Sequence, residues 1–234
     1  MLEMIAFDAD DTLWHNETLY QYAQDRYRQL LSDYARPDAV DRALLETEKR
    51  NMSRLGYGIK AFTLSMIETA VRLSEGQITG VEVQTILDLA IEMIDTPVQL
   101  LDYVHQVVNR LAQSHRLMII TKGDLLDQER KIAQSGLAPY VSHIEIVSEK
   151  HEDAYRSILD NYNVPAAHFL MVGNSLKSDI LPVAAIGGYA AYIPYHITWA
   201  HESVATLASV RDHYYELDHI GQLPPLVDQL QLGQ

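Results

Sequence analysis

The stretch MIAFDADDT, residues 4–12, decides the fold because an apolar run changes within it to an acidic cluster. Residues 4–7 are all apolar, as expected of a strand that is buried on both faces of a parallel sheet. Asp8, Asp10 and Thr12 follow this run directly. Because ligands bind beyond the carboxyl ends of the strands in open parallel sheets, these polar residues are the first candidates for a functional site.

Further stretches of strand length, most of their residues apolar, follow in the second half of the chain. They lie at residues 117–120, 144–147, 169–172 and 190–193, with helical segments between them. This alternation predicts an α/β fold with a parallel sheet, right-handed crossovers and helices on both faces. A helix over residues 99–113 is expected before the second strand. A last strand at residues 213–217 and a short helix that ends near Leu230 complete the prediction.

Residues 17–94 have a different pattern, in which apolar residues recur at helical spacing. Breaks near residues 36–37, 56–58 and 76–80 divide this stretch into about four helices. The pattern predicts an all-α domain over residues 16–95, inserted into a core that is formed by residues 1–15 and 96–234.

Composition narrows the range of partners. With 234 residues and 47% hydrophobic content, the chain can bury a sizeable core. Its formal net charge of −14 disfavours nucleic acid and anionic membranes as partners, so we expect a small substrate. The absence of cysteine excludes disulfides and a cysteine nucleophile. We see no signal-peptide pattern and no apolar run of ~20 residues, so we expect a cytoplasmic protein. The sequence does not indicate an oligomeric state.

The predicted strands deliver polar side chains to one edge of the sheet. Carboxylate and amide oxygens with room for a substrate suit Mg²⁺, and a carboxylate beside such a metal can attack phosphorus to form an acyl phosphate. A residue two positions after Asp8 can act beside it only if the chain bends at Ala9. A hydroxyl and a lysine can hold the phosphoryl oxygens. The candidate site residues are Asp8, Asp10, Thr121, Lys150, Asn174 and Asp179.

Four motifs in order resemble those of the haloacid dehalogenase-like hydrolases. Residues 8–12, DADDT, match the first motif, D-x-D-x-T. Thr121 is similar to the Ser or Thr of the second motif, and Lys150 to the lysine of the third. Residues 173–179, GNSLKSD, resemble the fourth motif, G-D-x-x-x-x-D. The resemblance covers essentially the whole chain and implies a Rossmann-like core with a helical cap between the first two motifs.

The resemblance implies a Mg²⁺-dependent phosphatase of a small phosphorylated metabolite. Asp8 would be the nucleophile and Asp10 the acid and base; Thr121 and Lys150 would bind the phosphoryl group. The metal ligands would be Asp8, Asp10, Asn174 and Asp179. Two features depart from the family pattern. The usual Asp at position 174 is Asn, which predicts weak metal affinity, and Lys122 or Lys177 could supply the cation in place of Lys150.

Other functions remain open at this point. Haloacid dehalogenases of the superfamily attack carbon without a metal and lack the second Asp, so Asp10 and Asp179 argue against that chemistry. A phosphomutase would keep all of these residues, and a catalytically silent binding or regulatory module would keep the fold. The predicted cap also carries Arg54 and Lys60 on either side of residues 56–58, where the resemblance to the family implies contact with the substrate.

Overall fold

The computed structural model describes residues 2–196 and 214–232 of the chain. The chain forms two compact units. The core unit comprises Met1–Glu17, Val98–Lys122 and Arg130–Gln234. The helical unit comprises Thr18–Pro97 and Gly123–Glu129, so that it includes a segment from the second half of the chain.

The core unit is built on a six-stranded sheet in which all neighbouring strands are parallel. The strand order is β3-β2-β1-β4-β5-β6, so β1 lies between β2 and β4. The predicted parallel sheet is confirmed. Of the last predicted strand, His213 lies outside the described residues. The strands are β1 (Met4–Phe7), β2 (Arg116–Lys122), β3 (His143–Val147), β4 (Phe169–Gly173), β5 (Tyr189–Tyr192) and β6 (Tyr214–Glu216).

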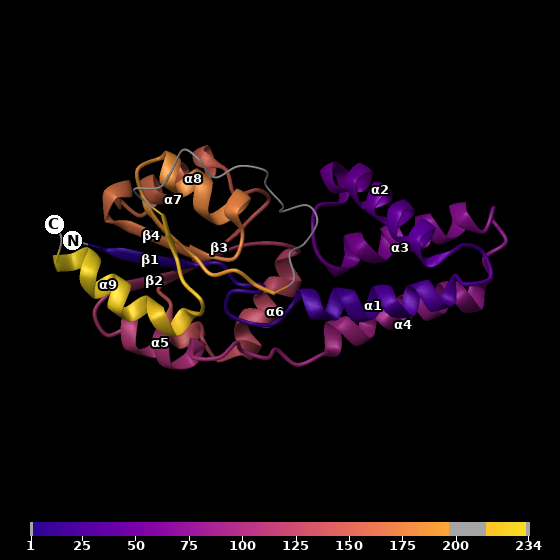
Figure 1. The fold of residues 1–234 in the computed structure, drawn as a ribbon, viewed down its shortest axis with the longest axis horizontal. Coiled ribbons are helices and arrows are strands. Elements are labelled where there is room, and N and C mark those ends of the chain that lie inside the picture. The colour runs from indigo at the N-terminus through magenta and orange to yellow at the C-terminus, as the bar shows by residue number, and fades with distance from the viewer. Residues whose placement is uncertain (1, 197–213, 233–234) are drawn as a thin grey trace. The chain divides into compact units, whose positions relative to one another are not determined.

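Helices cover both faces of this sheet because the side chains of its strands alternate between two apolar layers. Ile5 and Phe7 belong to one layer, and Met4 and Ala6 to the other. The first layer includes residues of α5 (Val104–Leu111), α6 (Leu125–Ser135) and α9 (Leu223–Leu232). The second includes residues of α7 (Glu152–Asn161) and α8 (Leu181–Ala185). Figure 1 shows α5 and α9 on one side of the sheet and α7 and α8 on the other.

The helix expected over residues 99–113 is shorter in the structure and begins at Val104. The residues before it are extended, because Leu100 pairs with Trp14 and the Leu101 amide donates to the Leu13 carbonyl at 3.0 Å. Tyr103 then takes a left-handed conformation with φ 67°, which α-helices exclude. The prediction of an earlier start was therefore wrong. The spacing of apolar residues carries no information about pairing with the loop after β1.

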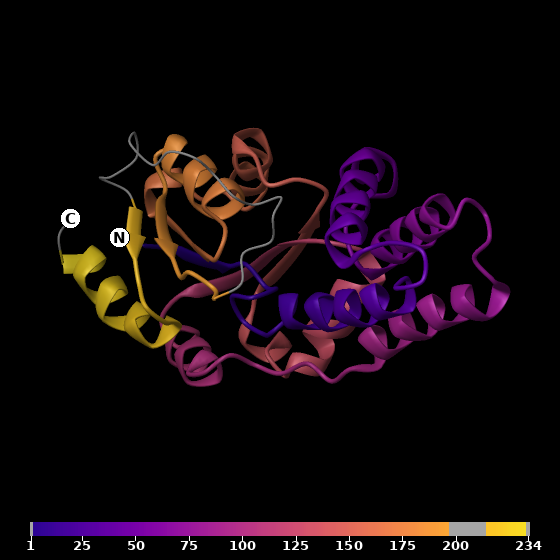
Figure 2. The ribbon, with the colours of Figure 1, turned by 45° about the vertical axis from the view of Figure 1, so that its right-hand side comes forward.

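The helical unit contains four long helices, and their ends agree with the predicted breaks. The helices are α1 (Glu17–Leu30), α2 (Pro37–Leu55), α3 (Ile59–Leu73) and α4 (Gly80–Asp95). Their apolar faces form one core around Tyr27, Phe62, Met66 and Ile86, in which the Tyr27 hydroxyl donates to the Met66 carbonyl at 2.7 Å. Figures 1 and 2 both show α4 running beside α1.

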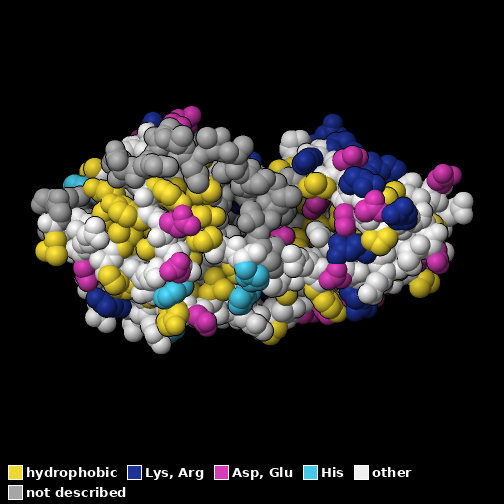
Figure 3. Space-filling view, in the orientation of Figure 1, with side chains coloured by type: hydrophobic (Ala, Val, Ile, Leu, Met, Phe, Trp, Pro, Cys, Tyr) yellow, Lys and Arg dark blue, Asp and Glu magenta, His cyan; other side chains and the backbone are white. Residues whose placement is uncertain are grey.

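The charged side chains of the helical unit lie mainly on its surface. On the face in Figure 3, Lys and Arg side chains gather over α2, with Asp and Glu side chains among them. Arg28 pairs with Asp41 at 2.8 Å and Arg42 with Asp38 at 2.9 Å. No helix in the described residues is long and apolar enough to cross a bilayer.

Candidate functional site

Asp8, the first residue after β1, is at the centre of a buried group of charges in the core unit. Its amide donates to the Val172 carbonyl at 2.8 Å and so continues the pairing of β1 with β4. Its Oδ1 accepts from the Lys150 ammonium at 2.5 Å, and its Oδ2 accepts from the Thr12 hydroxyl at 3.0 Å. Lys150 also donates to Asp179 Oδ1 at 2.8 Å. One ammonium therefore bridges two carboxylates that follow different strands.

Burial determines the protonation behaviour of this group. It raises the pKa of Asp8 to about 7, although the Lys150 ammonium acts in the opposite direction. Burial alone would lower the pKa of Lys150, but the charges of Asp179 and Asp8 outweigh that effect and raise it above its ordinary value. The two carboxylates therefore favour the cationic form of Lys150, whereas burial favours the protonated form of Asp8.

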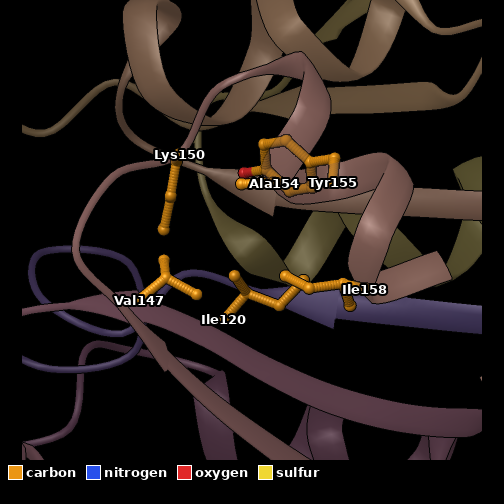
Figure 4. A pocket seen from close by; sticks show the side chains of 6 residues that line it. All are labelled: Ile120, Val147, Lys150, Ala154, Tyr155 and Ile158. Carbon is orange, nitrogen blue, oxygen red and sulfur yellow. The ribbon is translucent and has the colours of Figure 1, made fainter. Parts of the chain in front are cut away.

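The aliphatic part of the Lys150 side chain lies against an apolar hollow. The hollow is lined, besides Lys150, by Ile120, Val147, Ala154, Tyr155 and Ile158, which come from β2, β3 and α7. Figure 4 shows Lys150 beside these side chains. Surroundings of this kind exclude water, which strengthens the attraction between the ammonium and its two carboxylates.

Asp179 approaches the backbone closely at the end of β4. A Cβ at Gly173 would lie 2.2 Å from Asp179 Oδ2, so no residue larger than glycine fits there without a shift. The same Oδ2 accepts from the Ser175 amide at 3.0 Å. Asp179 is held in a short π-helical turn, η3 (Leu176–Ile180), whose Ser178 carbonyl accepts from the Tyr155 hydroxyl at 3.0 Å.

A tight turn follows Asp8, and its two ends pair in parallel through Asp10 and Trp14. The Leu13 amide donates to the Ala9 carbonyl at 2.8 Å, and Asp11 has a φ of 61°, in the left-handed region. The Asp11 carboxylate accepts from the amides of Asn16 and Glu17, at the start of α1. Burial raises the pKa of Asp11 to about 7, against the effect of these two amides. Asp11 thus stabilises the turn that separates Asp10 from the line of β1.

The Asp10 side chain, in this turn, accepts hydrogen bonds from Trp14 and Lys131. Trp14 Nε1 donates to Asp10 Oδ1 at 2.7 Å, and Lys131 Nζ donates to the same oxygen at 3.0 Å. Lys131 also donates to Asn16 Oδ1 at 2.7 Å. Sequence reasoning did not identify Trp14, Asn16 or Lys131. The available signal was weak: Lys131 follows Gln128 by three residues, and both lie on the buried face of α6 with Ile132.

The other predicted residues of the core unit lie at the ends of their strands. Thr121 is buried, and its hydroxyl donates to the Lys122 carbonyl at 3.4 Å. Asn174 Oδ1 accepts from the Thr12 hydroxyl at 3.3 Å. Of the three lysines considered for the cation, Lys150 contacts Asp8, whereas Lys122 donates to the Ser178 hydroxyl at 2.9 Å and Lys177 is exposed.

Arg54 and Lys60, the predicted substrate contacts, belong to the helical unit. Arg54 is exposed in the last turn of α2. Lys60 forms an ion pair with Asp124, its ammonium lying 2.9 Å and 3.0 Å from the two carboxylate oxygens. Any anion that binds Lys60 must therefore compete with Asp124.

The oxygen donors around Asp8 fit a hard divalent cation. The described residues contain no group of three or more His, Cys, Asp or Glu side chains that could hold a metal. Mg²⁺ needs only one or two carboxylates, since water and substrate oxygens complete its shell. Asp8 and Asp179 supply two carboxylates, and Thr12 links the Asn174 amide oxygen to Asp8. The donor chemistry of these residues therefore suits Mg²⁺.

Comparisons with known proteins agree with this architecture. The family model for haloacid dehalogenase-like hydrolases matches residues 2–187. A haloacid dehalogenase-like family hydrolase from Xanthomonas campestris is 37% identical, with 98% of this chain and 91% of that chain covered and a TM-score of 0.87. No curated protein matches the sequence.

Two more distant structures have the same fold. An L-2-haloacid dehalogenase from Xanthobacter autotrophicus with chloropropionic acid covalently bound is 15% identical, covering 97% of this chain and 99% of that one, with a TM-score of 0.67. A predicted phosphoglycolate phosphatase from Haemophilus somnus 129pt is 16% identical, covering 97% and 98%, with a TM-score of 0.62. At these identities, the likeness extends to the fold alone.

Proposed function

This chain belongs to the haloacid dehalogenase-like hydrolases, and we propose that within this family it is a phosphatase of small phosphorylated metabolites in the cytoplasm. The observation that carries the proposal is the presence of two anchored carboxylates in one turn. Asp8 is bonded to Lys150 and Thr12, while Asp10 is bonded to Trp14 and Lys131. One carboxylate can attack, and the other can move a proton.

The reaction has two steps. Asp8 attacks phosphorus, the bond from phosphorus to the alcohol oxygen breaks, and Asp10 gives its proton to that oxygen. Asp10 then takes a proton from a water molecule, whose oxygen attacks phosphorus and displaces the Asp8 carboxylate. Lys150 offsets the negative charge of the phosphoryl oxygens, with Thr121 as a hydrogen-bond donor. Inorganic phosphate and the alcohol leave, and both carboxylates return to their starting states.

Mg²⁺ would be held by Asp8, Asn174 and Asp179, with Asp10 as the fourth predicted ligand. When bound, it supplies positive charge opposite the phosphoryl oxygens. Arg54 and Lys60 stay predicted substrate contacts of the helical unit. Because Lys60 pairs with Asp124, a substrate anion would have to displace that carboxylate.

Dehalogenation makes less use of these residues. A halide leaves carbon as a stable anion and needs no proton, so a second carboxylate would have no part in its departure and could act only when water hydrolyses the ester intermediate. An alcohol leaving phosphorus needs a proton. The arrangement around Asp10 therefore favours phosphoryl chemistry.

The test is release of inorganic phosphate by the purified chain from an aryl phosphate and a panel of phosphorylated metabolites, with Mg²⁺ and with EDTA. Chloride release from 2-chloropropionate is measured in parallel. We expect Mg²⁺-dependent phosphate release that Asp8→Asn abolishes. Chloride release without phosphate release would identify a dehalogenase. Isomerisation of a sugar phosphate would identify a phosphomutase, and the absence of any turnover would indicate a silent module. Each of these three outcomes contradicts the proposal.

A further inference from the structure

Lys131 is a buried lysine of the core unit for which the chemistry above has no role. It is 5% exposed, on the part of α6 that belongs to the core unit. A buried ammonium is costly unless hydrogen-bonded partners offset the lost hydration. Its Nζ lies 3.0 Å from Asp10 Oδ1 and 2.7 Å from Asn16 Oδ1. The ammonium is therefore directed at the turn that carries Asp10.

Trp14 completes the support of Asp10. The indole is 1% exposed, and a buried indole N–H needs an acceptor, which Asp10 Oδ1 provides at 2.7 Å. Asp10 and Trp14 also pair through their backbones, so the donor lies in the same turn as its acceptor. Lys131, by contrast, reaches the carboxylate from a helix that is distant in sequence. It thereby links the turn to the body of the core unit.

We infer that Lys131 is a positioning residue that, together with Trp14, holds the Asp10 carboxylate in the orientation required for proton transfer to the leaving oxygen. This inference rests on the proposed phosphatase function. Asp10 lies beyond the end of β1, so the pairing of β1 with β2 and β4 does not extend to it. A displacement of ~1 Å in a reacting group can reduce a rate by ~10²-fold. Asn16 holds the ammonium from a second direction and so limits its movement.

The experiment compares Lys131→Met with wild type on an alkyl phosphate and on an activated aryl phosphate. The aryl leaving group depends little on a proton donor. We compare kcat/KM, because it reports the steps up to departure of the alcohol and excludes the later hydrolysis that both substrates share. We expect kcat/KM to fall by ~10²-fold on the alkyl phosphate and by about tenfold or less on the aryl phosphate. In an Asp10→Asn background, Lys131→Met should have almost no further effect, because both changes remove the same proton transfer. Lys49→Met, on the exposed surface of α2, is the matched control.

Chemical rescue separates positioning from a general effect on folding. The chain has no cysteine, so Lys131→Cys can be alkylated with 2-bromoethylamine in denaturant and refolded beside wild type treated in the same way. The product carries an ammonium group at nearly the length of lysine. It should recover most of the activity on the alkyl phosphate. If Lys131→Met does not fold, Lys131→Gln replaces it, since its neutral amide can form hydrogen bonds at a buried position.

Several results would overturn the inference. One is an equal loss of activity on both substrates in Lys131→Met. Another is an alkylated Lys131→Cys chain that recovers the melting temperature of wild type without recovering its ratio of activity on the alkyl phosphate to activity on the aryl phosphate. Crystal structures of wild type and Lys131→Met give a test that needs no substrate: an unmoved Asp10 carboxylate overturns the inference whatever the activity. Absence of phosphate release by wild type would instead contradict the proposed function, and a displaced Asp10 would still support positioning by Lys131.

Discussion

The core unit and the helical unit differ in whether they bury ion pairs. In the core unit, the side chains of Lys150 and Asp179 are each 1% exposed, and they form an ion pair. In the helical unit, the pair of Arg42 with Asp38 has side chains that are 68% and 53% exposed. The core unit thus contains buried ion pairs beside exposed ones such as Arg110 with Asp228, whereas the helical unit leaves its ion pairs at the surface, around an apolar core.

The buried charges are those to which the proposed function assigns chemical roles, whereas the exposed pairs lie at the surface. Burying an ion pair costs several kcal/mol of hydration, which mutual attraction often only offsets. Such a group persists where the position of a charge matters more than stability, as at Asp8. Exposed pairs contribute ~0–1 kcal/mol and affect solubility more than folding. The stability of the helical unit rests on its apolar core around Phe62 and Met66.

The helical unit has one carboxylate that departs from this pattern. Glu48 lies on α2, away from the solvent-exposed face of that helix. Burial raises the pKa of Glu48 to about 7. Asp8 has a pKa raised to a similar value, but an ammonium lies against it. Within the described part of the chain, Glu48 forms no ion pair, so the two carboxylates compare a desolvated charge with and without a paired cation.

Asp8→Asn should have the largest effect. The amide cannot attack phosphorus, so we expect kcat to fall by ~10⁴-fold or more, as when other nucleophiles are removed. Stability should change little, because Lys150 keeps its bond to Asp179. Steady-state phosphate release and urea unfolding measure the two quantities. Residual activity above about one per cent would contradict the assignment of Asp8 as nucleophile.

Lys150→Met should have the largest effect on stability. It leaves the buried carboxylates of Asp8 and Asp179 without their shared cation, so we expect the free energy of unfolding to fall by ~3–5 kcal/mol at pH 8. The folded-state pKa of Asp8, which burial already raises to about 7, would then lie further above its unfolded value. The loss should accordingly grow as pH rises through that range and be smallest near pH 5.

Arg42→Met is the control for this variant, because it also removes a paired cation, but from the surface of the helical unit. We expect a loss of ~0.5 kcal/mol or less that does not depend on pH between 5 and 8. Urea unfolding at both pH values measures both variants. Equal losses in the two would mean that burial does not distinguish the charges of the two units.

The layout of the fold could be predicted because it depends on local patterns. Apolar runs mark strands such as residues 4–7, and helical spacing between clear breaks marks the four helices of the helical unit. The start of α5 could not be predicted in this way, since the pairing of Leu100 with Trp14 is a tertiary contact. The segment around Leu100 has a composition typical of a helix, but its pairing with Trp14 keeps it extended.

In the candidate site, the residues that follow the ends of strands could be predicted from the sequence. Asp8, Lys150 and Asp179 follow strands, and the parallel sheet brings them to one edge, where they form one bonded group. Lys131 could not be found by this rule, because it lies within a helix. Its role depends on which residues of α6 face the turn after β1. Polar residues on the buried face of an amphipathic helix are the signal to seek in such cases.

Asn174→Asp tests whether an added charge in the core unit acts through the metal. A third carboxylate beside Asp8 and Asp179 should strengthen Mg²⁺ binding by ~1–2 kcal/mol after desolvation losses. The Mg²⁺ concentration for half-maximal activity should then fall by about tenfold. The control is Asn161→Asp, which adds the same charge at an exposed position on α7. A half-saturation value that is unchanged or higher in Asn174→Asp would show that residue 174 does not bind the metal directly.

Glu48→Gln should have the smallest effect, and it should have the opposite sign to that of Lys150→Met. In the folded state, the pKa of Glu48 is about 7 against an ordinary 4.5, so the fold favours the protonated acid. Wild type therefore loses stability as pH rises from about 4.5 to 7, whereas glutamine cannot ionise. We expect Glu48→Gln to be more stable than wild type by ~1 kcal/mol at pH 8, because partial exposure screens the charge, and about equal to it at pH 4.5. Urea unfolding at both pH values measures this difference, with Glu46→Gln at an exposed position of the same helix as the control. A Glu48→Gln chain that is less stable than wild type at pH 8 would show that a cation compensates this carboxylate as Lys150 compensates Asp8, and the contrast between the two units would fail at this residue.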